Sequence, residues 1–113
     1  MAHYLVWCSV PDAACGHDLA QQMVTARLAA CVSVLPGIRS HYVWQGAVCD
    51  SEEALLMIKT TADAWPSLRA WIQAHHPYQV PEIIAQAIDD GHVPYLAWLS
   101  EQVQTQHTPN EQT

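Results

Sequence analysis

Three groups of side chains in this sequence could carry chemistry: four cysteines, the adjacent histidines His75 and His76, and the adjacent glutamates Glu52 and Glu53. No pair of cysteines has the C-x-x-C spacing that is typical of structural zinc or of a dithiol redox centre. The spacing also indicates no disulfide framework, so we expect free thiols in a reducing compartment. The cysteines are Cys8, Cys15, Cys31 and Cys49.

A Cys–His enzyme is one hypothesis for these residues, with Cys8 as the nucleophile and His75 as its general base. Such an enzyme also needs hydrogen-bond donors that stabilise an oxyanion, and no motif in the sequence indicates them. Glu52 and Glu53 are neighbours on a predicted strand, so they point to opposite sides and make a poor acid–base pair. We therefore expect a protein that is not an enzyme, in which both glutamates are structural.

The charge content is low for a soluble domain and acidic in balance. Charged residues make up 13% of the 113 residues, against roughly 25% in average domains, while 50% are hydrophobic. The net charge of −7, with four Lys and Arg in total, argues against binding to nucleic acid, which requires clustered basic residues. So few charges cannot coat a monomer, and we expect apolar surface to be buried against other copies of the chain.

Hydrophobic periodicity and turn residues predict alternating strands and helices. Their order is βαββαβ with an added C-terminal helix, which indicates an α+β, ferredoxin-like fold: an antiparallel sheet with two helices on one face. The expected elements are a strand at Tyr4–Val10, a helix at Asp12–Ala30, a strand at Cys31–Trp44 interrupted by Pro36-Gly37, a strand at Ala47–Thr60 after a Gln45-Gly46 turn, a helix from Asp63 to His76, a strand at Ile83–Ile88 and a helix from Pro94.

We expect one domain over residues 1–103, followed by a polar tail at 104–113 that is disordered. The first residues lack the basic and long apolar segments of a secretory signal, and no apolar run reaches the ~20 residues of a membrane helix. These features predict a cytoplasmic protein with no membrane partner.

Six short motifs together resemble the CutA family of divalent-cation tolerance proteins, over about Leu5 to Leu99. Each motif is weak alone, and their combination is specific. They are LAACV at 28–32, LPG at 35–37, YVWQG at 42–46, IKTT at 58–61, HHPYQVPEI at 75–83 and YLAWL at 95–99.

The resemblance implies a ferredoxin-like subunit in a cytoplasmic homotrimer, with a role associated with copper and other divalent cations. Bacterial members have been linked to copper bound by a first-strand cysteine and two adjacent histidines, which match Cys8, His75 and His76 here. Thiolate and imidazole suit copper, although folding of a chain this size should not require the metal. His75 continues an inward helical stripe and should approach Cys8, whereas His76 should face outward once Pro77 has ended the helix.

Structural interpretations of the same residues stay open. Cys8 sits in an apolar run where a free cysteine packs as a small hydrophobe, and His75 fits equally well as a hydrogen-bonded core histidine. Tyr42, Trp44 and Trp98 are expected to anchor subunit packing. A further alternative is a trimeric signalling module resembling the PII regulators, with a neutral or cationic small ligand in clefts between subunits.

Overall fold

The computed structural model describes residues 2–104, which form an antiparallel four-stranded sheet with three helices. The sheet order is β2-β3-β1-β4, which is the ferredoxin-like arrangement predicted from the element order. Of the predicted tail, all but Gln104 lies outside the described residues. The elements are β1 (His3–Val10), α1 (Ala13–Thr25), β2 (Cys31–Trp44), β3 (Ala47–Thr61), α2 (Trp65–His75), β4 (Ile83–Ala87) and α3 (Val93–Gln102).

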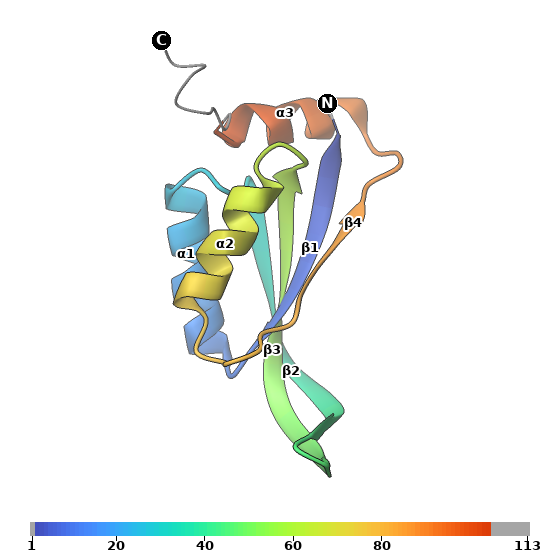
Figure 1. Ribbon diagram of the computed structural model, residues 1–113. Coiled ribbons are helices and arrows are strands. Elements are labelled where there is room, and N and C mark those ends of the chain that lie inside the picture. Colours follow the sequence, from blue (N-terminus) through green and yellow to red (C-terminus); the bar gives the residue numbers. More distant parts are fainter. Residues whose placement is uncertain (1, 105–113) are drawn as a thin grey trace.

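The core lies between one face of the sheet and the helices α1 and α2, which cover it side by side (Figure 1). Alternate residues of the central strands point into this layer, as the two-residue period of a strand requires. These fully buried side chains include Val6 and Cys8 on β1 and Leu56 and Ile58 on β3, which meet Met23, Leu68 and Ile72 from the helices. Within residues 2–104, no helix is long and apolar enough to cross a membrane.

Helix α1 ends at Thr25, five residues before the predicted end at Ala30. The chain stops there with a Schellman motif: Arg27 has a φ of +61°, Leu28 N donates to Met23 O at 3.0 Å, and Arg27 N donates to Val24 O. This stop is usually made by glycine, so the sequence carried no signal for it. Helix α2 begins at Trp65, two residues after the predicted start at Asp63, and its N-cap is Ala64.

The β2–β3 hairpin contains the predicted interruption at Pro36-Gly37. Leu35 pairs with Leu55 and Ile38 pairs with Glu53, so β2 carries one extra residue at this β-bulge. Because side chains alternate along a strand, the extra residue switches the face on which the later residues of β2 lie. The turn at Gln45-Gly46 has φ values of +51° and +80°, which are those of the predicted tight hairpin turn.

The second face of the sheet is left uncovered by α1 and α2 (Figure 1). We call it the open sheet face, and it carries Trp7, Leu55 and Met57, which are half-buried, with Leu35 and Ile84 more exposed. Beyond the bulge the hairpin extends past β1, whose pairing with β3 stops at Ala54. A two-stranded ribbon of this kind is marginally stable in water by itself.

Candidate functional site

Cys8 lies at the centre of the sheet, where β1 pairs with β3 on one side and with β4 on the other. Its side chain is fully buried, and Sγ is 3.8 Å from the carbonyl oxygen of Ser9, to which the thiol donates weakly. Burial, followed by the charges of Glu82 and Cys15, raises the pKa of Cys8 from 9.0 to about 12. The side chain is therefore a neutral thiol at neutral pH, which is neither the nucleophilic nor the metal-binding form of cysteine.

The two histidines face the opposite directions from those predicted: His75 is exposed and His76 is buried, with 8% of its surface exposed. The inward stripe of α2 runs from Leu68 through Ile72 at a spacing of four residues, and the next position in that series is His76. The backbone leaves the helix at His76 with a ψ of 139°, as Pro77 predicted. The expectation that His75 approaches Cys8 was therefore wrong.

His76 uses both ring nitrogens inside the protein. Its Nδ1 accepts a hydrogen bond from the backbone N–H of Tyr78 at 3.0 Å, so Nε2 carries the proton and donates to Ser9 O at 2.8 Å. These bonds attach the segment after α2 to the end of β1. A metal ion could bind His76 only by breaking one of them, which leaves a buried backbone group unpaired.

His75 retains one nitrogen that suits a metal ion. Its ring stacks on Trp71, with centroids 4.1 Å apart, and Nδ1 donates to Trp71 O at 2.8 Å. Metal-binding histidines usually donate their second nitrogen to a carbonyl or carboxylate in this way, which leaves Nε2 with a lone pair. His75 thus has the orientation of a ligand, whereas Cys8 and His76 do not.

The three predicted metal ligands do not converge on one point in a single subunit. Across the described residues 2–104, no three His, Cys, Asp or Glu side chains gather in an arrangement that could hold a metal ion. Copper therefore does not fit the set Cys8, His75 and His76 as this subunit arranges it. The geometry also separates the proposed enzyme pair, because Cys8 contacts Ser9 O while His75 contacts Trp71.

A cavity of about 710 Å³ lies between the stem of the hairpin and residues 77–82, which join α2 to β4. We call it the hairpin cavity. Glu53 in its wall is 7% exposed, and its Oε2 accepts a 2.7 Å hydrogen bond from the hydroxyl of Tyr78. Burial, together with that carboxylate, raises the pKa of Tyr78 well above its usual value, so the phenol stays protonated and donates.

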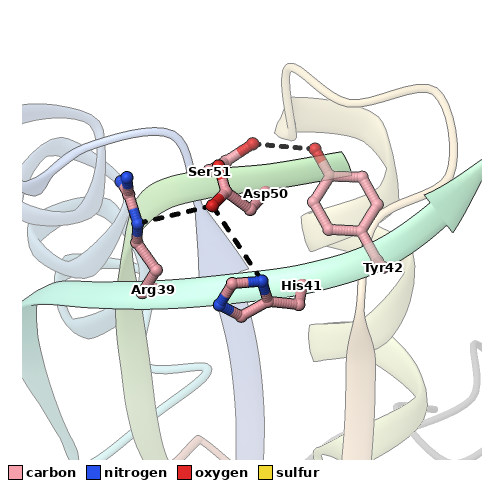
Figure 2. Close-up of polar contacts among 5 residues, drawn as sticks. All are labelled: Arg39, His41, Tyr42, Asp50 and Ser51. Carbon is pink, nitrogen blue, oxygen red and sulfur yellow. Dashed lines mark hydrogen bonds and ion pairs between the residues drawn. The ribbon is translucent and has the colours of Figure 1, made fainter. Parts of the chain in front are cut away.

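The hairpin wall of the cavity is held by polar contacts between its two strands, shown in Figure 2. The hydroxyl of Tyr42 and Ser51 Oγ are 2.8 Å apart. Asp50 Oδ2 lies 3.8 Å from Arg39 Nε and 4.0 Å from His41 Nδ1, so one carboxylate contacts both of those side chains. The contact with Ser51 therefore fixes the ring of Tyr42 in the wall of the cavity.

The sequence did not predict this cavity, because Glu53 was interpreted only as a structural residue. Glu53 does share a strand face with Leu55 and Met57, and a carboxylate in line with half-buried apolar residues was the available signal. Its partner Tyr78 lies 25 residues away and appeared in the sequence only as part of the motif at 75–83.

Comparison with known proteins gives consistent matches over nearly the whole chain. The sequence profile of the family described as CutA1 divalent ion tolerance protein matches residues 4–102. A curated relative from Thermus thermophilus, named divalent-cation tolerance protein CutA, is 45% identical over 97 residues, which cover 86% of this chain and 94% of the relative.

Solved structures match the fold as well as the sequence. The crystal structure of CutA1 from Oryza sativa superposes with a TM-score of 0.90 at 38% identity, covering 92% of this chain and 95% of the rice chain. A protein from Archaeoglobus fulgidus, described as the periplasmic divalent cation tolerance protein CutA, superposes with a TM-score of 0.87 at 28% identity, covering 90% of this chain and 99% of that one.

Proposed function

The chain belongs to the CutA1 family of divalent ion tolerance proteins, and from this premise we propose that it acts as a cytoplasmic, non-catalytic homotrimer that binds copper or another divalent cation. The names of the relatives support the cation part of this proposal. The periplasmic description of the Archaeoglobus fulgidus protein applies to that protein. The cytoplasmic part of this proposal is supported by the four cysteines, whose spacing indicates no disulfide framework.

The uncovered apolar surface is the observation that carries the trimer. Large hydrophobic side chains are exposed on the edge strand β4, where Ile84 is 56% exposed, and on the hairpin, where Val43 is 69% exposed. A single domain rarely leaves so many apolar groups in water, and an exposed strand edge pairs readily with another chain. Two neighbouring copies would cover the open sheet face and support the protruding hairpin of each subunit.

Light scattering after size exclusion tests this assembly. We expect a particle of about three times 12.6 kDa. Ile84→Asp should reduce the mass to that of one subunit, because the carboxylate would be buried at the interface. Val24→Asp is the matched control, since Val24 is 39% exposed on α1, away from the open sheet face, and should leave the trimer intact. A wild-type monomer would overturn the trimer proposal.

Of the expected ligand set Cys8, His75 and His76, His75 is the principal ligand that we propose for a divalent ion. Imidazole is a strong ligand for Cu²⁺, and the Nε2 lone pair of His75 is aligned by the bond from Nδ1 to Trp71. One imidazole binds an ion weakly, so the remaining ligands would be water or donors from a neighbouring subunit. Cys8 and His76 would have to give up burial or hydrogen bonds to take part.

Copper-induced shifts of the melting temperature test the ligands one at a time. We expect His75→Gln to lose most of the shift seen in wild type, and Cys8→Ala to retain it, because the buried thiol is protonated. Glu101→Gln, an exposed change on α3, serves as the control. Equal shifts in wild type and His75→Gln would remove His75 from the site and overturn this part of the proposal.

The hairpin cavity favours a second candidate function. Its volume of about 710 Å³ lies in the range of small-ligand sites, roughly 300–1,000 Å³. A trimeric signalling module resembling the PII regulators would place a small ligand in such a cleft beside a neighbouring subunit. A Cys–His hydrolase is disfavoured, because the pKa of about 12 at Cys8 keeps the nucleophile protonated.

A further inference from the structure

The hairpin cavity places a buried carboxylate beside a second one. Glu53, which is 7% exposed, and Glu82, which is exposed, both line the cavity. The hydrogen bond that Glu53 receives comes from the neutral hydroxyl of Tyr78, and this bond does not cancel the charge of the carboxylate. A buried charge is ordinarily paired with an opposite charge, because desolvation of an unpaired ion is costly.

Within residues 2–104 of one subunit, no Lys or Arg lines this cavity. The chain has four Lys and Arg residues, and in the described structure each is engaged elsewhere. His41 lines the cavity, but its Nδ1 is directed to Asp50 at 4.0 Å. Arg27 donates a hydrogen bond to Gln102, and Lys59 donates one to Ser33. Arg39 forms an ion pair with Asp50, and Arg69 lies over the ring of Trp65.

Aromatic rings make up much of the remaining wall. Tyr42, Trp44 and Tyr78 line the cavity and expose 43%, 44% and 36% of their surfaces. The hydroxyls of Tyr42 and Tyr78 are held by Ser51 and Glu53, so at least two of the rings are fixed before a ligand arrives. Aromatic faces attract organic cations, whose charge is spread over apolar groups. A metal ion fits less well, because no three His, Cys, Asp or Glu side chains within residues 2–104 gather closely enough to hold one, although His41 lines the cavity with the two glutamates.

We propose that the hairpin cavity binds a small organic cation, an alkylamine or alkylammonium, with its charge at Glu53 and Glu82 and its alkyl groups against Tyr42, Trp44 and Tyr78. This inference rests on the second candidate function, the ligand-binding module, and it names the chemical class of that ligand. It is independent of copper binding at His75, which lies outside the cavity lining.

Calorimetric titration of the assembled wild-type protein with three probes of similar shape tests the charge requirement. The probes are isopentylamine, its neutral isostere isopentanol, and the anion isovalerate. An alkylamine is protonated at pH 7, because amines of this type have pKa values of about 10.4. We expect the amine to bind at least about ten-fold more tightly than the alcohol, with no binding of the anion. Equal affinity for amine and alcohol would overturn the proposal, since a merely apolar pocket makes no distinction between them.

Two neighbouring glutamates give a matched pair of variants. Glu53→Gln keeps an acceptor for the Tyr78 hydroxyl but removes the charge, and should weaken the amine about ten-fold or more. Glu52→Gln makes the same change on the exposed opposite face of β3 and should bind as wild type. Tyr78→Phe removes the hydroxyl and leaves the carboxylate, so amine binding should persist. Equal losses in the two glutamine variants would refute a role for Glu53.

Copper provides a competition experiment that separates the two proposals. If Cu²⁺ displaces the amine and Glu53→Gln abolishes copper binding, the cavity is a metal site and the organic-cation proposal is wrong. If the trimer mass and the copper shift at His75 stay as expected while the amine fails to bind, this inference falls and the proposed function stands. Upfield shifts of the amine methyl signals in proton NMR, lost in Trp44→Leu, would support contact with the aromatic wall.

Discussion

Alkaline pH should destabilise this protein through Cys8. In the unfolded chain the thiol loses its proton near its ordinary pKa of 9.0, whereas burial in the folded chain raises that pKa to about 12. Between these values the unfolded state binds fewer protons than the folded state, so the free energy of unfolding falls as the pH rises. The stability that the protonated thiol provides is fully present below pH 9 and decreases at roughly 1.4 kcal/mol per pH unit above it.

The expected loss between about pH 8 and pH 10 is therefore roughly 1.4 kcal/mol from Cys8 alone. The assay is urea unfolding at both pH values, at one protein concentration and in the presence of reductant, because subunit association would make stability depend on concentration. Cys8→Ala is the comparison, since it removes the titrating group. Its own cost, about 1 kcal/mol for one deleted heavy atom, is the same at both pH values.

The result that would refute this reasoning is an equal pH-dependent loss in wild type and Cys8→Ala. Every other side chain is shared by the two proteins, so the difference between the two losses isolates Cys8. Alkylation by iodoacetamide gives a second readout, because only the thiolate reacts. Cys8 should react far more slowly than Cys49, which is partly exposed at the hairpin. Fast alkylation of Cys8 in the folded protein would contradict its burial.

Three substitutions test the packing that positions the site. Asp12→Ala should cost about 1 kcal/mol in urea unfolding, because Asp12 accepts a 2.8 Å hydrogen bond from Cys15 N at the start of α1, while Asp12→Asn should cost little. Thr60→Val should cost about 1–3 kcal/mol, because it removes the hydroxyl that donates a 2.7 Å hydrogen bond to the Leu28 carbonyl. An unchanged melting temperature would show that water replaces this hydroxyl. Gly16→Val should cost about 1–3 kcal/mol or prevent folding, because a Cβ at Gly16 would lie 3.1 Å from a side chain of β3 and 3.2 Å from one of β2. A variant with full stability would disprove such close packing of α1 on the sheet.

Local patterns in the sequence were enough to predict the order and type of the elements. The short apolar run Tyr4–Val10, the positive φ tolerated at Gly46 and the restriction that Pro77 places on His76 all act within a few residues. Each of these features is confirmed, as is the antiparallel fold that their order implies. The early end of α1 was missed because a non-glycine residue, Arg27, takes the left-handed position.

The sequence by itself thus determined the fold and the family, whereas the tertiary structure decided which side chains meet. His75 and His76 exchanged their predicted directions, because the inward face of α2 continues to the residue at which the helix ends. The cavity depends on one extra residue in β2, which places Tyr42 on the same face as Glu53, and on Tyr78 from a distant segment. Hydrophobic periodicity predicts the type of a local element and the face that it buries. Contacts between segments far apart in the chain depend on how whole elements pack and on their register.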